Sequence, residues 1–279
     1  MPVLVDKLIP NFLIVGACKS GTTTFYEDLA AHPESAMPDI KEPDILHKAV
    51  DANHAIELWT QHFKRTQHGK VRGEGSTYYT MTPEFPDVSQ LAREVMGKNG
   101  KIIYIVRDPI ERIVSHLAHD FAVGRITSTN FDDIALSERR YVDWSDYPTQ
   151  IQPWIDAFGA NQVKIVRFEQ FVQDRRRVVQ DVSQFLGLDP DRLPVRHAIS
   201  NKRGSQIALK SPYLSKLVHT GIYREIVRSA LPANVRKSLR HLLGRKNAPP
   251  NVTLSKNARS NLSKRLFHVN SWINEINFL

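Results

Sequence analysis

A short loop with a glycine at its start and another inside it carries the residues best suited to bind an anion. Residues 16–24 read Gly-Ala-Cys-Lys-Ser-Gly-Thr-Thr-Thr and lie between an apolar run and a stretch with helical spacing. Glycines let successive backbone N–H groups turn toward one point, and a helix N-terminus adds a positive dipole there. The loop therefore predicts a site for a phosphate or a sulfate. A glycine turn that only packs a helix against a strand is the plainer alternative.

The loop departs at one position from the P-loop of nucleotide triphosphatases, which reads G-x4-G-K-S/T. Thr22 stands where that motif has its lysine, and Lys19 lies inside the loop instead. The P-loop uses a lysine and a hydroxyl together to hold a magnesium-bound γ-phosphate, and this pair is incomplete here. A P-loop kinase or NTPase, with Thr23 as its magnesium ligand, is disfavoured but stays the alternative enzyme class.

The composition is that of an ordinary globular protein. The chain has 279 residues, of which 41% are hydrophobic and 24% charged, so it can form one large α/β domain or two small ones. We predict a single domain over residues 1–279. One cysteine, Cys18, excludes an internal disulfide framework and fits a small buried residue better than a reactive thiol.

Charge and hydropathy limit which classes of binding partner and which cellular compartment we expect. The formal charge of +9 favours anionic partners without choosing between cofactor phosphates, acidic glycans, nucleic acid and a membrane surface. Neither a zinc-type spacing of Cys and His nor an RNA-binding aromatic signature is present, and we expect no nucleic-acid partner. The sequence shows no signal-peptide pattern and no apolar span of transmembrane length, so we expect a cytoplasmic protein without a transmembrane segment.

The pattern of apolar residues predicts the elements that position the loop. Buried strands are expected at 12–15, 101–106 and 163–168, with a brief strand at 35–37. Helices are expected at 51–63, 88–96, from about residue 110, at 151–158, 178–186 and 222–243, and at 255–276 as a final docking helix after a linker at 245–251. Residues 120–148 are polar and poorly periodic, which predicts a long excursion or lid.

Strands that alternate with helices predict an α/β fold with a P-loop-like, mainly parallel central β-sheet flanked by helices. Ligands of such sheets bind beyond the carboxyl ends of the strands. Gly16 and Arg107 both follow a predicted strand directly. We therefore expect them to face one site, although about ninety positions separate them in the sequence.

Two segments together resemble the sulfotransferases that use 3′-phosphoadenosine 5′-phosphosulfate (PAPS). GACKSGTTT resembles their 5′-phosphosulfate loop, and IIYIVRDPIERIVSHLAHD resembles their 3′-phosphate strand and helix, with Arg107 and Ser115 at the two contact positions. HPESAMPDIKEPDIL looks like the acid-bearing segment of the glycan and bacterial branches. VKIVRFEQFVQD followed by FLGLD also fits, so the resemblance spans most of residues 10–190.

The resemblance implies the sulfotransferase fold and an enzyme that uses PAPS as donor, releases 3′-phosphoadenosine 5′-phosphate (PAP) and requires no metal. It places Lys19 beside the bridging oxygen and Arg107 and Ser115 at the 3′-phosphate. The 5′-phosphate would be held by Ser20, Gly21, Thr22, Thr23 and Thr24. A late basic loop with Lys202, Arg203 and Gly204 would cover the nucleotide, although a surface turn fits these residues equally well.

The general base must be a carboxylate or imidazole that reaches the acceptor oxygen. Glu42 matches the acid of the glycan branch in position and is the first choice, and a surface ion pair with Lys41 is its plainer role. His47 is the second candidate because of its ordinary pKa, and Asp44 and Glu74 are held in reserve.

The acceptor and the oligomeric state are not fixed by the sequence. A glycan, lipid, small metabolite or peptide fits as acceptor. Heparan-type members often carry a lysine directly after the acid that corresponds to Glu74, and this chain has Gly75 there, which weighs against a heparan-like polymer. A protein that only binds a nucleotide or a polyanion, without catalysis, is the non-enzymatic alternative.

Overall fold

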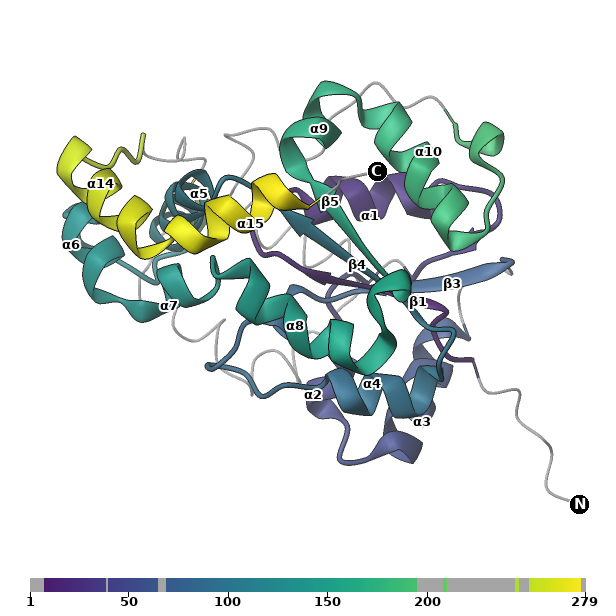
Figure 1. Cartoon of the computed structure of the whole chain (residues 1–279). Helices are drawn as coiled ribbons and strands as arrows, with labels where there is room; N and C mark the ends of the chain where they lie inside the picture. The colour runs from purple at the N-terminus through teal and green to yellow at the C-terminus, as the bar shows by residue number, and fades with distance from the viewer. Residues whose placement is uncertain are drawn as a thin grey trace, which may run out of the picture.

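A five-stranded parallel sheet forms the centre of the computed structural model, with strand order β2-β3-β1-β4-β5 (Figure 1). The structure describes residues 8–38, 40–64, 69–194, 208–209, 244–245 and 251–276. The strands of the sheet are β1 (Phe12–Gly16), β2 (Ser35–Ala36), β3 (Val71–Gly75), β4 (Lys101–Val106) and β5 (Val163–Arg167). The chain fills one side of β1 with β2 and β3 and then crosses to the other side, so the end of β1 lies at the switch point of the sheet.

The buried strands pack side chains on both of their faces, which explains their continuous apolar sequence. In β1, Phe12 and Ile14 pack into the core on one face, whereas Leu13 and Val15 pack into the core on the other. The residues of β4 alternate in the same way. The apolar run at 101–106 therefore predicts β4 correctly to the residue.

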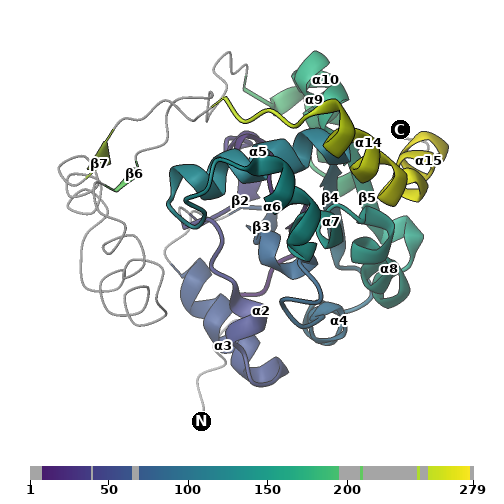
Figure 2. The same cartoon turned by 90° about the vertical axis from the view of Figure 1, so that its left-hand side faces the viewer.

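Helices cover both faces of the sheet (Figure 1). On one face lie α1 (Thr22–Ala30), α9 (Phe168–Gln173) and α10 (Arg175–Leu186). On the other lie α2 (Ile45–Lys48), α3 (Ala52–Phe63), α4 (Ser89–Met96) and α8 (Tyr147–Phe158). Figure 2 shows α5 (Pro109–Ala122), α6 (Phe131–Ser137) and α7 (Arg139–Asp143) together at one end of the sheet. The sequence-based prediction of a parallel α/β fold is confirmed.

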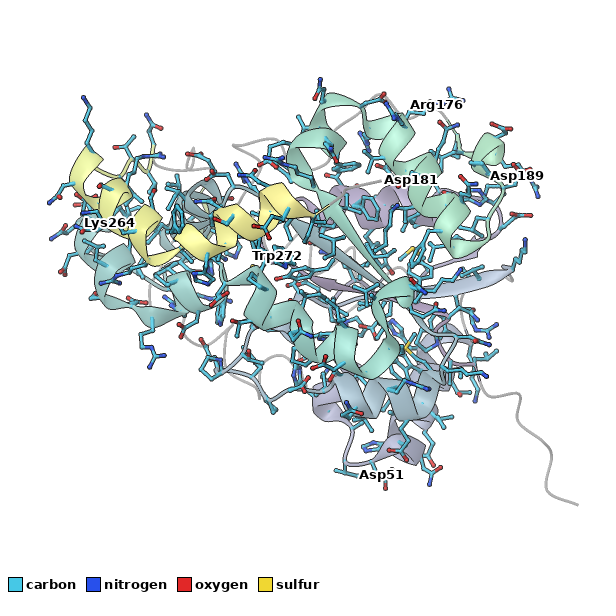
Figure 3. The ribbon with its side chains drawn as sticks, viewed as in Figure 1. Asp51, Arg176, Asp181, Asp189, Lys264 and Trp272 are labelled. Carbon is cyan, nitrogen blue, oxygen red and sulfur yellow. The ribbon has the colours of Figure 1, made fainter. Side chains whose placement is uncertain are left out.

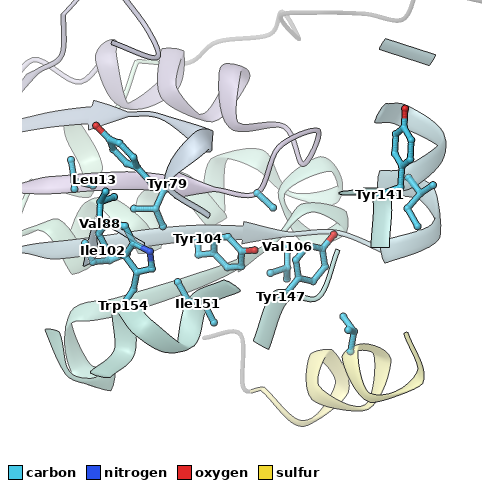
Figure 4. Packing of buried hydrophobic residues seen from close by; sticks show 14 of the residues in the cluster. Leu13, Tyr79, Val88, Ile102, Tyr104, Val106, Tyr141, Tyr147, Ile151 and Trp154 are labelled. Atoms are coloured by element: carbon cyan, nitrogen blue, oxygen red, sulfur yellow. The ribbon is translucent and has the colours of Figure 1, made fainter. Parts of the chain in front are cut away.

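Aromatic side chains fill much of the larger core (Figure 4). Tyr104 of β4 meets Tyr147 edge to face, with ring centroids 6.0 Å apart. Tyr79 and Trp154 pack together farther along the same core, with centroids 6.2 Å apart. The surface is charged by contrast, and Arg176 on α10 and Lys264 on α14 (Lys256–Arg265) stand outward (Figure 3).

One prediction about the middle of the chain is wrong. Residues 120–148 are not an unstructured excursion, because α6, α7 and the start of α8 fold there, and Tyr141, Trp144 and Tyr147 are buried. These helices are too short for their periodicity to show, and their packing comes from tertiary contacts. The predicted final docking helix is confirmed, with a break at Leu266 between α14 and α15 (Phe267–Glu275), and its apolar face packs into the core.

Some predicted elements lie outside the described residues, among them 197–204, 222–243 and most of 245–251. A short antiparallel pair, β6 (Ala208–Leu209) with β7 (Gly244–Arg245), is described apart from the main sheet. Among the helices that the structure describes, none has the length and apolar character needed to cross a membrane. That a single domain extends over residues 1–279 stays a prediction.

Candidate functional site

The glycine loop joins the end of β1 to the start of α1 at the switch point of the sheet. The backbone N–H of Ala17 donates to the carbonyl oxygen of Ile105 at 2.8 Å, which ties the loop to β4. Lys19 has φ of +68° and Gly21 has φ of +84°, so the chain turns sharply before α1 begins at Thr22. The first turn of a helix leaves backbone N–H groups outside its own ladder, and they point toward the space above the loop.

Arg107 brings the end of β4 to the same loop. Its Nη1 donates a long hydrogen bond of 3.4 Å to the carbonyl oxygen of Lys19. Its guanidinium carbon lies 4.7 Å from the ring centroid of Phe168, which follows β5. The same ring covers Gly21, where a Cβ would lie 2.7 Å from Cε2 of Phe168. The ends of three strands therefore converge on the loop, and Arg107 lies beside it.

Sequence reasoning missed Phe168, because nothing in the order of residues shows that a ring will lie over a distant glycine. Ser115, the second residue expected at a 3′-phosphate, is half-buried two turns into α5. Lys202, Arg203 and Gly204, expected to cover the nucleotide, lie outside the described residues. The structure therefore brings together the loop and Arg107, and it leaves the basic loop undescribed.

The acid segment that precedes α2 lies against the end of β3. The backbone N–H of Glu42 donates to the carbonyl oxygen of Gly75 at 2.9 Å. Oε1 of Glu42 accepts a hydrogen bond of 3.2 Å from the hydroxyl of Thr77. Glu42 and Asp44 have φ of +58° and +55°, values that are uncommon for residues other than glycine. The surrounding contacts hold the carboxylate of Glu42 at the rim where the strands end.

Lys41 connects this acid segment to the glycine loop. Its Nζ donates to Oε1 of Glu42 at 3.0 Å and to Oγ1 of Thr23 at 3.0 Å. A third, longer contact of 3.4 Å reaches Oγ1 of Thr22. Sequence reasoning considered Lys41 only as a surface partner of Glu42. The ammonium instead bridges the carboxylate and the two hydroxyls at the start of α1.

His47 has both ring nitrogens engaged by acceptors. Nδ1 lies 2.7 Å from Oδ1 of Asp44, and Nε2 lies 3.1 Å from the carbonyl oxygen of Pro86. Burial alone would lower the pKa of His47, but the hydrogen bond and charge of Asp44 outweigh it, and the net shift is upward. An imidazole that donates from both nitrogens is protonated. A protonated ring has no lone pair with which to take a proton from the substrate that receives the transferred group.

Glu74 is buried below the acid segment and accepts three hydrogen bonds. Trp59 Nε1 donates to it at 2.7 Å, the hydroxyl of Ser76 at 2.7 Å and that of Tyr79 at 3.2 Å. Burial raises the pKa of Glu74 from 4.5 to about 7, against the effect of these donors. Ser76 Oγ in turn accepts from the backbone N–H of Asp44 at 3.0 Å. Glu74 therefore supports the acid segment from beneath.

Position 75 explains one departure from the heparan-type pattern. A Cβ added to Gly75 would lie 2.9 Å from Cδ2 of Tyr26, a buried ring of α1. A lysine at this position would have to displace that ring. The end of β3 therefore carries no side chain into the space between Tyr26 and the acid segment.

Burial in the loop shifts the pKa values of both Lys19 and Cys18. Burial lowers the pKa of the half-buried Lys19 and raises the pKa of Cys18. A raised pKa keeps the thiol protonated, which agrees with a small structural residue. Because Lys19 is half-buried, water screens its ammonium less than at the surface, and the ammonium can interact more strongly with an anion.

A buried polar row on α5 supports the loop from the side of α7. Arg112, His116 and Asp120 follow one another at four-residue spacing and are all buried. Asp120 accepts from the hydroxyl of Tyr141 at 3.0 Å and pairs with Arg140 at 3.2 Å. Burial and the charge of Arg112 hold the pKa of His116 well below its ordinary value, so its ring is neutral. These contacts fix α5, and with it the position of Arg107 at the end of β4.

Comparisons with known proteins agree on one family. A model described as "Sulfotransferase domain" matches residues 10–229. Mouse heparan sulfate glucosamine 3-O-sulfotransferase 3A1 is 27% identical over 193 residues, which cover 66% of this chain and 47% of that protein. Mouse bifunctional heparan sulfate N-deacetylase/N-sulfotransferase 4 is 26% identical over 202 residues, 65% of this chain and 23% of the relative. The chain thus spans about half the length, or less, of these curated relatives.

A solved structure shows the same fold. The crystal structure of a sulfotransferase from Alicyclobacillus acidocaldarius superposes with a TM-score of 0.60 at 26% sequence identity. The alignment covers 69% of this chain and 87% of that one. The parallel sheet and its flanking helices are therefore shared with a bacterial protein of similar extent.

Proposed function

Because the chain belongs to the sulfotransferase domain family, we propose that it transfers a sulfuryl group from PAPS to a hydroxyl or amine of an acceptor. The observation that carries the proposal is the approach of Arg107 to the glycine loop, at 3.4 Å from the carbonyl oxygen of Lys19. A donor with a phosphate at each end of its ribose needs two anion sites close together. The loop supplies one, and the fork of Arg107 supplies the other.

Lys19 and Glu42 have different roles in the proposed transfer. In an in-line displacement the acceptor oxygen or nitrogen forms a bond to sulfur as the bond from sulfur to the bridging oxygen breaks. The electron pair of that bond stays on the 5′-phosphate of PAP, where the ammonium of Lys19 and the N-terminus of α1 offset the charge. The proton of the acceptor passes to a carboxylate oxygen of Glu42. Glu42 is preferred to His47 as the base, because both nitrogens of His47 are engaged by acceptors.

The contacts of Lys41 weigh against the kinase or NTPase alternative. In that class the hydroxyl of Thr23 would coordinate magnesium. Here Nζ of Lys41 donates to this hydroxyl at 3.0 Å, so a cation already occupies the place beside it. The proposed donor is accordingly bound without a metal ion.

Nucleotide binding provides the first test. Calorimetric titration in EDTA should show binding of PAP and much weaker binding of ATP. The same titrations are then repeated with magnesium. Tight, magnesium-dependent binding of ATP with no affinity for PAP would support the kinase alternative instead.

Transfer provides the second test. Incubation with ³⁵S-labelled PAPS and a panel of glycans (heparan-type chains among them), lipids, small metabolites and peptides should label at least one acceptor. Mass spectrometry then locates the sulfate in the product. Binding of PAP without labelling of any acceptor class would favour the non-enzymatic alternative.

A further inference from the structure

The ammonium of Lys41 spans the two groups that the proposed transfer places on opposite sides of the sulfuryl group. On one side it donates to Thr23 Oγ1 at 3.0 Å, at the start of α1 where the 5′-phosphate would bind. On the other it donates to Glu42 Oε1 at 3.0 Å, the proposed acceptor of the proton. A line from the acceptor oxygen through sulfur to the 5′-phosphate runs between these two sides. The ammonium therefore lies beside the path of transfer.

Building on the proposed function, we propose that Lys41 binds the sulfuryl group of the donor and releases Glu42 to act as the base. In the structure the ammonium of Lys41 holds Oε1 of Glu42. When the donor occupies the loop, an oxygen of its sulfuryl group takes the place of Oε1 as a partner of this ammonium. Oε1 is then free to accept the proton of the acceptor, so the base becomes available only in the loaded enzyme.

The ion pair between Lys41 and Glu42 is partly exposed, so little free energy is lost when a sulfuryl oxygen replaces the carboxylate. The side chains of Lys41 and Glu42 are 19% and 35% exposed. Ion pairs in such partly solvated positions contribute little to stability, because solvent screens them. A charge-assisted hydrogen bond to an anion that is bound away from solvent is stronger. The sulfuryl oxygen thus competes successfully with the carboxylate for the ammonium.

Glu42 keeps its position when Lys41 changes partner. Its backbone N–H remains bonded to the carbonyl oxygen of Gly75, and Thr77 continues to donate to its carboxylate. Lys41 is held in the same way by the hydroxyls of Thr22 and Thr23. The exchange therefore requires no movement of the backbone, only a new partner for one of the three N–H groups of the ammonium.

Lys41 and Lys19 have separate tasks under this proposal. Lys19 lies within the loop, next to the leaving phosphate, whereas Lys41 reaches the loop from the acid segment. Removal of Lys41 should therefore weaken the binding of PAPS, which carries the sulfuryl group, more than the binding of PAP, which lacks it. Removal of Lys19 should weaken the binding of both nucleotides.

The experiment compares Lys41→Met, Lys41→Arg and wild type, with Lys98→Met as a matched control. Lys98 is exposed after α4 and takes no part in the site, so its replacement removes one surface charge and nothing else. Affinity for PAP and, without acceptor, for PAPS is measured by calorimetry, and turnover at saturating donor by ³⁵S transfer. For Lys41→Met we expect about 10- to 100-fold weaker binding of PAPS, the range of one charge-assisted hydrogen bond, and a change below about threefold for PAP.

Lys41→Arg should restore most of the selectivity for PAPS, because the guanidinium keeps the charge and the donors. Turnover of Lys41→Met at saturating donor should also fall, whereas Lys98→Met should match wild type in every assay. Equal losses for PAP and PAPS in Lys41→Met would place the ammonium on the 5′-phosphate and overturn the proposal, and so would no loss for either. A wild type that binds neither nucleotide would overturn the proposed function itself, which is a different result.

Discussion

The guanidinium of Arg107 stacks on the ring of Phe168, with 4.7 Å between its central carbon and the ring centroid. A ring beside the guanidinium restricts the positions that this flexible side chain can take. Its Nη1 donates to the carbonyl oxygen of Lys19 in the loop. Phe168 therefore aims Arg107 at the loop, and the arrangement is suited to a bidentate contact with a phosphate.

Arg107→Ala tests this arrangement directly. Loss of a bidentate, charge-assisted contact to the 3′-phosphate should cost about 2–3 kcal/mol of binding free energy for PAP. Binding of adenosine 5′-monophosphate, which lacks the 3′-phosphate, should change little. Calorimetric titration of both nucleotides gives the comparison.

Arg107→Lys is the control for charge alone. It keeps the positive charge but loses the planar fork and the stacking on Phe168, so we expect an intermediate affinity for PAP. Equal losses for PAP and adenosine 5′-monophosphate in Arg107→Ala would mean that Arg107 maintains the shape of the loop and does not bind the 3′-phosphate.

Gly21→Ala should damage both the stability of the protein and its affinity for PAP. The left-handed conformation at φ of +84° costs a residue with a Cβ about 1–2 kcal/mol. The new Cβ would also lie 2.7 Å from the ring of Phe168, so the ring on which Arg107 lies must shift. Chemical denaturation measures the first effect and calorimetry with PAP the second.

Gly187→Ala is the matched control. Gly187 ends α10 with φ of +79°, and a Cβ there would meet nothing within 4 Å. This variant should lose stability through the backbone alone and should bind PAP like wild type. If Gly21→Ala also binds PAP normally, contact between Phe168 and the loop is unimportant for the site.

The sequence predicts best those elements whose signal is local. A strand buried on both faces is apolar over its buried length, so β4 is visible as the apolar run from Ile102 to Val106 that follows Lys101. Helix α10 is equally clear, because Gly187 ends it in the left-handed conformation. Since parallel strands place their carboxyl ends together, the meeting of Arg107 with the loop follows from topology alone.

The rest depends on contacts between distant segments. The short helices α6 and α7 have little periodicity, and Tyr141 is buried there against α5, where Asp120 accepts a hydrogen bond from its hydroxyl. The bridging position of Lys41 is equally invisible, because adjacency to Glu42 suggests a simple surface pair. Only the fold brings Thr23 within 3.0 Å of the same ammonium.

The pH dependence of stability should reveal the buried carboxyl of Glu74. Its pKa is raised from 4.5 to about 7, chiefly by burial, so the folded state binds a proton more tightly than the unfolded chain. This contribution to stability is fully present below about pH 4.5 and is lost as the pH rises to about 7. The loss amounts to about 3 kcal/mol, at 1.36 kcal/mol for each pKa unit.

Glu74→Gln removes the titration and keeps most of the shape. We expect the difference in unfolding free energy between wild type and this variant to shift by about 2 kcal/mol between pH 5 and pH 7.5, in favour of the variant at the higher pH. Denaturant titrations at several pH values measure how this difference changes with pH. A loss of stability that the substitution causes equally at every pH does not affect that slope. A difference that is flat with pH would show that the donors from Trp59, Ser76 and Tyr79 keep Glu74 ionised throughout.

Glu42→Gln tests the proposed base. Gln keeps the length of the side chain, and its amide oxygen can still accept from Thr77, so the acid segment should keep its fold. It cannot accept the proton of the acceptor, however. We therefore expect turnover to fall by about 10²- to 10⁴-fold while the affinity for PAP stays near that of wild type. Rapid-mixing measurement of a single round of ³⁵S transfer separates this effect from product release.

His47→Gln distinguishes the two candidates for the base. The ring of His47 donates to Asp44 and to the carbonyl oxygen of Pro86, so its role in the structure is to hold the segment that follows Glu42. Gln can replace one of these hydrogen bonds, and we expect a modest loss of stability with less than a tenfold change in turnover. The opposite pattern, near-normal turnover in Glu42→Gln and collapse in His47→Gln, would move the base to the histidine. It would also show that the proton of His47 is given up when the donor and acceptor bind, because an imidazolium has no lone pair to offer.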